Sequence, residues 1–266
     1  MAGGGGSNEL VMTTAGTVLA GGVSGVGSYV LANGGANSLT LANANFGGLG
    51  GAAIWVYGGN SGNTVNAAAL TGSNRIVAFG GAGADTLTGG AGNDTFEFAA
   101  ANLASTDKVS GGGGTNFLQM TSSGTVLAGG VSGVEVYDLA STGANRLTLA
   151  NANFAGVSGG SIRVNGGNAG NRVDAAALTG ANHVVAVGGA GADTFIVGRN
   201  ATLTGGGGAD LFEFTTPGST AAPTADTITD FTAGTDRIAF SNAGFSLGLA
   251  GASATPHALP TSLFST

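Results

Sequence analysis

The chain has 266 residues, of which 54 are glycine, 42% are apolar and only 8% are charged. A disordered chain would combine low hydrophobicity with high charge, and collagen would need glycine at every third position, so neither class fits. Without cysteine there are no disulfides, and a net charge of −7 disfavours nucleic acid or anionic lipid as partners and favours cations. The N-terminus has no signal-peptide pattern, and we expect no membrane span.

Two copies of one long repeat follow each other along the chain. "GTVLAGGVSGV" at 16–26 recurs at 124–134, and "LTLANANF" at 39–46 recurs at 147–154, both displaced by 108 residues. This tandem duplication predicts copy one over residues 3–98, a connector over 99–110, copy two over 111–214 and a C-terminal segment over 215–266. Copy two contains eight additional residues, "VGRNATLT" at 197–204.

Each copy is built from a smaller unit: glycine, one residue, Asn or Asp, one residue, then an apolar residue. Gly, Asn and Asp tolerate tight-turn conformations, and the alternation after them has the period of a strand. From Asn63 onward the units are 11, 11 and 9 residues apart, too close for crossover helices. We therefore predict an all-β fold, a parallel β-roll or right-handed β-solenoid; a helical fold is disfavoured because glycine destabilises helix interiors.

The apolar residue of each unit is expected to point into the coil. These predicted core positions are Leu39, Ile54, Val65, Ile76, Leu87 and Phe96 in copy one, and Leu147, Ile162, Val173, Val184, Phe195 and Phe212 in copy two.

Four of the units are glycine-rich nonapeptides: "GGAGADTLT", "GGAGNDTFE", "GGAGADTFI" and "GGGGADLFE". They resemble the repeat of the RTX, or hemolysin-type calcium-binding, family, and "TADTITDFTAGTDRIAF" at 224–240 resembles the segment that often follows those repeats. The resemblance implies a β-roll in which Ca²⁺ is held by turn carbonyls and aspartates. Calcium takes six to eight oxygen ligands, which such turns supply.

In the β-roll implied by the resemblance, one ion lies between a turn and the second turn after it. Asp193 and Asp210, 17 residues apart, should then stack on the same edge and share Ca²⁺ with carbonyls near Gly188, Ala190, Gly206 and Gly208. Asp85 and Asp94, nine apart, should face opposite edges, so copy one should bind more weakly. Asp94 would pair with the turn of Asn74 or with Asp107, leaving Asp85 without an acidic partner.

The downstream aspartates Asp226, Asp230 and Asp236 are either further ligands or, at "TDRI", part of a surface ion pair with the neighbouring arginine. Where asparagine takes the same slot, we expect it to bond the next turn rather than a metal. These asparagines are Asn8, Asn37, Asn74, Asn116, Asn145 and Asn182.

An enzymatic function is not expected. "GVSGG" at 156–160 matches the G-x-S-x-G string of esterases, but copy one has "GLGGA" at the same place and neither His183 nor His257 is positioned by a motif as a base. Trp55 should point outward, as should its copy-two counterpart Arg163.

The sequence therefore predicts a calcium-binding structural module, a segment of a larger secreted or cell-surface RTX protein. The resemblance implies export by type I secretion and folding on calcium outside the cell. Two alternatives stay open: an adhesin or surface-layer module that binds a glycan or a sister chain, and the non-catalytic C-terminal part of a secreted hydrolase.

Overall fold

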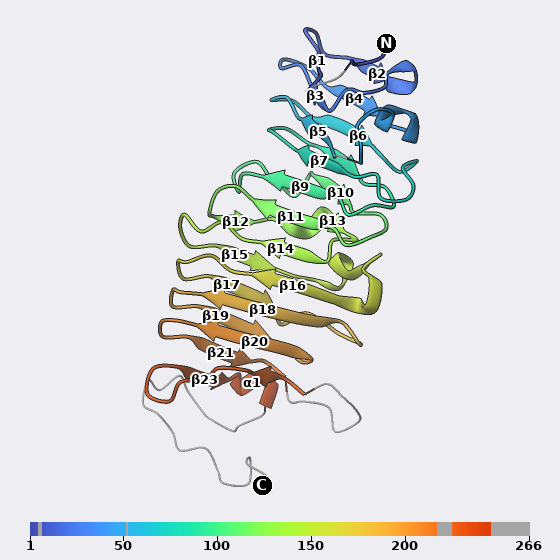
Figure 1. Cartoon of the computed structure of the whole chain (residues 1–266). Helices are drawn as coiled ribbons and strands as arrows, with labels where there is room; N and C mark the ends of the chain where they lie inside the picture. The colour runs from blue at the N-terminus through green and yellow to red at the C-terminus, as the bar shows by residue number, and fades with distance from the viewer. Residues whose placement is uncertain (5–6, 52, 217–224, 246–266) are drawn as a thin grey trace.

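A computed structural model describes residues 1–4, 7–51, 53–216 and 225–245. Strands stack in register along a solenoid, with almost no helix among them (Figure 1). All strand pairs in the described chain are parallel, as the close spacing of the units predicts. The expected fold class is confirmed.

One sheet runs the length of the solenoid and is called the long sheet. Within the described residues it contains eleven strands: β1 (Glu9–Val11), β3 (Ser28–Val30), β5 (Ile54–Tyr57), β7 (Ile76–Phe79), β9 (Thr95–Phe98), β11 (Phe117–Met120), β14 (Val136–Asp138), β16 (Ser161–Asn165), β18 (His183–Gly189), β20 (Ala201–Gly206) and β22 (Thr227–Ile228).

Two shorter sheets complete the coils. The N-terminal short sheet contains β2 (Thr17–Leu19), β4 (Asn37–Thr40), β6 (Asn63–Asn66), β8 (Thr86–Thr88), β10 (Lys108–Ser110) and β13 (Val131–Ser132). The C-terminal short sheet contains β12 (Thr125–Val126), β15 (Arg146–Thr148), β17 (Arg172–Ala175), β19 (Thr194–Val197), β21 (Leu211–Phe214) and β23 (Arg237–Phe240).

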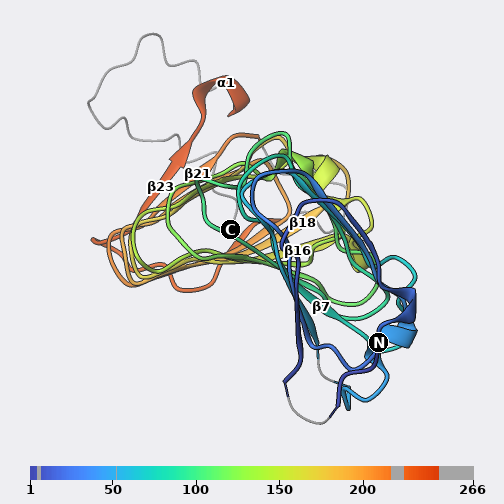
Figure 2. The same ribbon diagram turned by 90° about the horizontal axis from the view of Figure 1, so that it is seen from above.

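The coil that follows β11 joins the two short sheets. Its β12 begins the C-terminal short sheet and its β13 ends the N-terminal one, while the long sheet passes through unbroken. Seen from above, the N-terminal coils are displaced from the C-terminal coils (Figure 2). The duplicated halves are thus offset around one shared sheet, and β10, in the predicted connector, pairs with β8.

Short helices turn the corners. They are the 3₁₀ helices η1 (Ala20–Gly22), η2 (Asn43–Phe46), η3 (Ala128–Gly130), η4 (Asn151–Phe154) and η5 (Ser158–Gly160), and the α-helix α1 (Asn242–Phe245). Buried Asn45 and Asn153 fix η2 and η4: the amide of Asn45 donates to the carbonyls of Ala20 and Val23 at 2.6 and 2.7 Å. Asn153 makes the same two contacts one repeat later.

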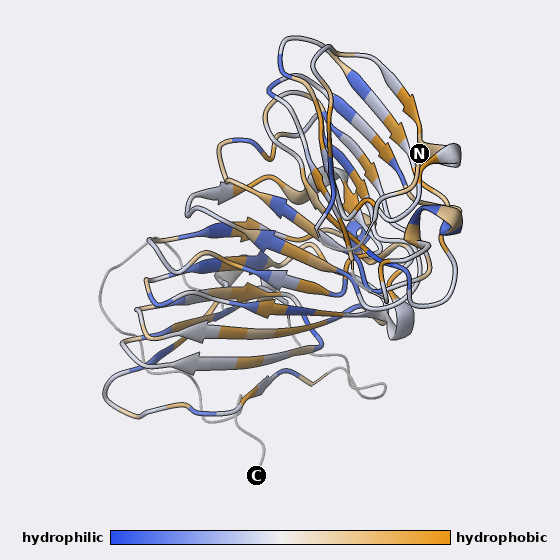
Figure 3. Cartoon of the chain, turned by 45° about the horizontal axis from the view of Figure 1, so that its top comes forward, coloured by the Kyte–Doolittle hydropathy of each residue, from blue (hydrophilic) through white to orange (hydrophobic). Residues whose placement is uncertain are grey.

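The core lies between the sheets and is filled by every second residue of most strands, which Figure 3 shows as alternating hydropathy along the strands. In β7 and β19, three consecutive residues are buried. All twelve predicted core side chains are at most 2% exposed, which confirms those positions. Close packing of apolar side chains on both sheets is the main source of stability in a chain without disulfides.

The eight extra residues of copy two change the sheet to which the next strand belongs. They provide β20 in the long sheet, so the next strand, β21, falls in the C-terminal short sheet. In copy one the sequence-equivalent strand β9 lies in the long sheet. The spatial counterpart of Asp210 is therefore Asp107 rather than Asp94, a relation that sequence alignment of the copies hides.

Candidate metal centre

Buried Asn and Asp side chains form two ladders along the turns that precede the short sheets. The N-terminal ladder contains Asn37, Asn63, Asp85 and Asp107, and the C-terminal ladder contains Asn145, Asn171, Asp193, Asp210 and Asp236. Each side chain after the first of its ladder contacts the member one coil before it. All except Asp236 are at most 3% exposed.

Main-chain donors tie the aspartates to the preceding coil. The N–H of Asn171 donates to Asp193 Oδ1 at 2.6 Å, and the N–H of Asp193 donates to Asp210 Oδ1 at 2.8 Å. The structure thus brings Asp193 and Asp210 together on one edge, as their spacing predicts. Such charge-assisted bonds hold neighbouring coils at a fixed register.

Asp85 and Asp94 lie on different edges, again as predicted, but the expected partners are wrong in one respect. Asp107 Oδ1 accepts a hydrogen bond from the N–H of Asp85 at 2.7 Å, so Asp107 stacks with Asp85 and not with Asp94. Asp94 instead accepts from the N–H of Ile76 at 2.7 Å, beside the turn of Asn74, and its own N–H donates to Asn116. Residues 99–107 lead from β9 in the long sheet to β10 in the N-terminal short sheet, and this places Asp107 on the edge of Asp85.

The asparagines of the ladders sit in cages of oxygen atoms. The amide nitrogen of Asn171 lies 3.2 Å from the Gly167 carbonyl oxygen, 2.6 Å from that of Ala169, 3.1 Å from that of Gly188 and 3.0 Å from Asp193 Oδ1. One nitrogen thus faces four oxygens. The amide nitrogens of the other ladder asparagines, Asn37, Asn63 and Asn145, are also surrounded by oxygen acceptors, as is that of Asn116 in the turn before β11.

An aspartate in the same slot has no N–H to offer to such a cage. Asp193 Oδ2 is buried and has no hydrogen-bond partner in the described part of the chain. A Cβ added at Gly188 would collide with both Asp193 Oδ2 and the Gly205 carbonyl oxygen, so these two oxygens converge on one point. Asp85 Oδ2 is likewise buried and unpartnered among the described residues.

Burial raises the pKa of these carboxyls. It raises the pKa of Asp85 to about 7, and hydrogen bonds from Asn63 oppose the shift. It raises the pKa of Asp94 and Asp193 to about 6, with hydrogen bonds again opposing it. For Asp85 and Asp193, the next aspartate in the ladder adds to the rise. Charged carboxylates in this place therefore need a compensating positive charge or a proton.

The oxygens that correspond, by position in the repeat, to the cage of Asn171 are the carbonyls of Gly189, Gly191 and Gly205 and Asp210 Oδ1. The sequence-based set, carbonyls near Gly188, Ala190, Gly206 and Gly208, lies in the same two turns and stays a prediction. The Gly188 carbonyl accepts from Asn171 on the preceding coil, and the Gly189 carbonyl accepts from the N–H of Gly207. Carbonyl oxygens with few carboxylates are ligands of the kind that calcium takes.

In the described residues, this edge included, no group of three His, Cys, Asp or Glu side chains could hold a metal ion, so the candidate centre offers two carboxylates together with main-chain carbonyls. The downstream aspartates act on turns: Asp226 accepts from the N–H of Ala201, Asp230 from those of Gly205 and Gly206, and Asp236 from those of Asp210 and Thr232. The described residues contain one ion pair, Arg172 with Asp174, so the proposed surface pair at "TDRI" is absent from them.

Asparagines of the repeat unit divide into two groups. Asn8, Asn37, Asn116 and Asn145 bond the turn or the next coil as expected. Asn74 and Asn182 are half-buried and instead donate, in solvent-exposed bonds, to Asn43 and Asn151. Sequence reasoning missed Asn63 and Asn171 as ladder members because their units lack a residue, although both lie four residues after the second glycine of a "GGN" turn.

The esterase-like string does not form a nucleophile elbow. Ser158 is exposed and starts η5, a 3₁₀ turn between two coils, whereas the motif requires a strand-to-helix turn. The ring of His183 contacts the Thr202 hydroxyl at 3.2 Å. His257 lies outside the described residues, as does most of the predicted C-terminal tail.

Comparison with known protein families agrees with this geometry. Residues 71–102 match the family of RTX calcium-binding nonapeptide repeats (4 copies), and residues 131–248 match the family Peptidase M10 serralysin C terminal. The chain therefore contains an RTX-type repeat segment. No curated protein and no solved structure shows significant similarity to it. Among the described residues, no helix has the length and apolar character needed to span a membrane.

Proposed function

We propose that the chain is a calcium-binding structural β-roll module of a secreted or cell-surface RTX protein, and that it folds on calcium outside the cell. One observation carries the proposal. Where asparagine fills the ladder slot its amide donates into an oxygen cage, and where Asp193 fills it a buried carboxylate oxygen faces a carbonyl oxygen with no donor between them. A bound cation would compensate the charge of such a cluster.

Asp193 and Asp210, with the carbonyls of Gly189, Gly191 and Gly205, would hold an ion in copy two. Asp85 and Asp107 would be the acidic pair of a second site in copy one, and Asp94 would be a ligand on the opposite edge. Bound Ca²⁺ supplies positive charge to oxygens that otherwise repel one another. Copy one should bind more weakly, because the turn before Asp107, "ANLASTD", lacks the glycines that let carbonyls converge.

Binding and folding are linked because the oxygens converge only in the stacked coil. Without the ion, burial of unpaired carboxylate oxygens opposes folding. Proteins with RTX repeats and serralysin C-terminal domains are typically exported by type I secretion. A chain without cysteine that stays unfolded at low cytosolic calcium suits that route, and millimolar calcium outside the cell would then order it.

The test is far-UV circular dichroism of the whole chain in EGTA and in about 5 mM CaCl₂, with Mg²⁺ as control. For sites with Kd of about 10⁻⁴–10⁻³ M, this calcium concentration adds about 1–2 kcal/mol per site to the free energy of unfolding. We expect β signal to appear with calcium and not with Mg²⁺. The same cooperative unfolding curve in EGTA as in calcium would disprove the proposal.

The match of residues 131–248 favours one of the alternative settings, the non-catalytic C-terminal part of a secreted hydrolase. Serralysin C-terminal domains are non-catalytic parts of proteases. In that setting the solenoid would be a folding and export unit attached to a catalytic domain. Sequencing upstream of codon 1 in the parent gene tests it directly: a peptidase domain there supports this setting, and a further array of repeats contradicts it.

A further inference from the structure

Three aromatic side chains form a flat patch on the outer face of the long sheet near its N-terminal end. Trp55 and Tyr57 lie on β5 and are 40% and 38% exposed, and Phe79 lies beside Tyr57 on β7. Their ring planes are within 15–23° of parallel, with centroids 4.7–6.4 Å apart. We call Trp55, Tyr57 and Phe79 the aromatic platform.

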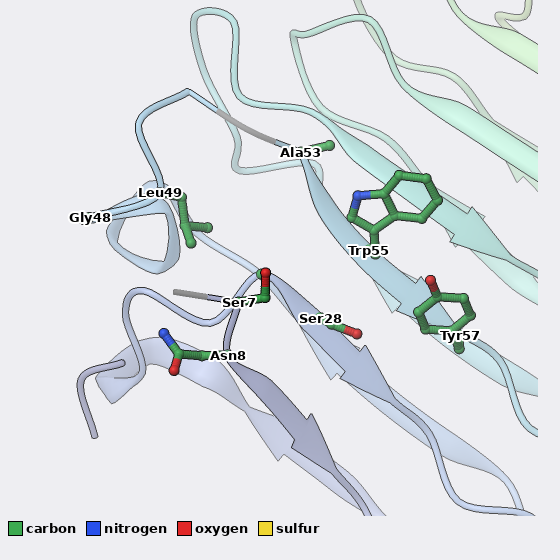
Figure 4. Close-up of a pocket in the computed structure, with 9 residues that line it drawn as sticks. Ser7, Asn8, Ser28, Gly48, Leu49, Ala53, Trp55 and Tyr57 are labelled. Carbon is green, nitrogen blue, oxygen red and sulfur yellow. The ribbon is translucent and has the colours of Figure 1, made fainter. Parts of the chain in front are cut away.

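A hollow of about 410 Å³ adjoins this platform, in the size range of small-molecule sites. Trp55 and Tyr57 form one side of it, and Figure 4 shows their rings side by side along β5. Ser7, Asn8 and Ser28 bring polar groups to the other side. The hollow therefore pairs exposed aromatic rings with hydroxyl and amide groups, and none of the described residues that line it carries a charge.

Copy two shows that the fold does not require these rings. The residues at the equivalent positions are Arg163, Asn165 and Val187, which occupy neighbouring strands in the same register. There the surface is polar: Asn165 donates to Asp138 at 2.6 Å and accepts from Arg163 at 2.7 Å. The two faces have diverged since the duplication, so a structural need of the coil does not explain the aromatic platform.

We propose that the aromatic platform and its hollow bind a neutral glycan, with pyranose rings stacked on Trp55 and Tyr57. An equatorially substituted pyranose has a flat face of C–H groups and a rim of hydroxyls. The C–H face matches parallel aromatic rings, whose π faces attract weakly positive hydrogens. The hydroxyl rim matches the hydroxyl groups of Ser7 and Ser28, beside an Asn8 amide that donates to the Gly4 and Gly25 carbonyls.

Charge selects the neutral class of glycan. The chain carries a net charge of −7, and Glu9 accepts a hydrogen bond from the Ser28 hydroxyl at 3.3 Å at the margin of the hollow. Within the described part of the chain, no cationic side chain lines the hollow to receive an acidic sugar. Uronate and sialylated glycans should therefore be repelled, while uncharged β-linked glucose or N-acetylglucosamine chains should not.

The test is isothermal titration of the whole chain in calcium with cellohexaose, N-acetylchitohexaose and, as the anionic comparison, a polyguluronate oligomer. The variant carries W55R, Y57N and F79V, the residues that copy two already accommodates. We expect the native chain to bind at least one neutral hexasaccharide and not polyguluronate. The variant should bind roughly tenfold more weakly or not at all, which corresponds to a loss of at least about 1.4 kcal/mol.

A matched control changes the equivalent face of copy two, R163A with N165A and V187A, and should bind like the native chain. Circular dichroism and the calcium response should be native-like in both variants, which separates this inference from the calcium proposal. Native-like affinity in the platform variant, or no binding of either neutral hexasaccharide, would overturn the inference. So would sedimentation showing that the native chain self-associates and the platform variant does not.

Discussion

Asp210 accepts a hydrogen bond at 2.8 Å from the main-chain N–H of Asp193 on the coil before it. The contact places two carboxylates on one edge of the solenoid and leaves Asp193 Oδ2 buried beside the Gly205 carbonyl. Because the native turn contains acceptors without a donor, its stability should respond to anything that adds a donor or a cation.

Replacing Asp193 and Asp210 together by asparagine should supply that donor. Each new amide would enter the cage as the amide of Asn171 does, while Oδ1 would still accept from the preceding coil. We expect the variant to show β signal and a thermal transition in EGTA, because each added hydrogen bond raises the free energy of unfolding by about 1 kcal/mol, and to show a smaller calcium response. Thermal scans with and without calcium measure both.

The comparison variants for this experiment are D85N with D94N, and D138N alone. The copy-one pair should lose less of the calcium response, because its two aspartates lie on different edges. Asp138 lies outside the ladders, so D138N should leave the calcium response unchanged. Equal losses from the two double variants would contradict the assignment of the better site to copy two.

The reverse substitution, Asn171→Asp, should increase the calcium requirement. It would place a carboxylate against three carbonyl oxygens and Asp193, so the variant should need a higher calcium concentration than the native chain to fold. Calcium titration followed by circular dichroism detects the increased dependence. Asn182→Asp is the matched control, since the half-buried Asn182 makes one solvent-exposed bond to Asn151 instead of entering a buried cage, and its stability should change less.

Acidity should partly replace calcium. The folded pKa values of Asp85, Asp94 and Asp193 lie at about 7, 6 and 6, above the ordinary 3.8, so the folded state binds more protons than the unfolded state across this window. The free energy of unfolding in EGTA should therefore fall as pH rises from about 4 to about 7. Melting temperatures across that range measure it, and a rise toward neutral pH would show that burial of these carboxyls does not control the stability.

Glycine positions within one turn should differ sharply in tolerance. A Cβ at Gly188 would collide with the Asp193 carboxylate and the Gly205 carbonyl, whereas a Cβ at Gly207 would have its nearest neighbour at 3.6 Å. Gly188→Ala should cost about 1–3 kcal/mol of stability and weaken calcium binding, and Gly207→Ala should leave both near native. Chemical denaturation and calcium titration of the two variants make the comparison.

The repeats, the strand period and the core positions follow from the amino-acid sequence alone. Turn residues and alternation act within a few positions, so the inward placement of residues such as Leu39 and Phe212 follows from local pattern. The family resemblance of the nonapeptides is equally local, because each motif consists of adjacent residues. The outward position of Trp55 followed from the same alternation.

The pairing of turns on neighbouring coils depends on the tertiary structure. Loop length sets the edge on which each turn lies, and the local sequence pattern does not encode it. Asp107 therefore contacts Asp85, and the extra eight residues bring Asp210 to the position in its ladder that Asp107 has in the other. The cage of Asn171 draws oxygens from two coils, and the aromatic platform joins Tyr57 to Phe79 across strands 22 residues apart. Both sites exist only once parallel pairing has fixed the register.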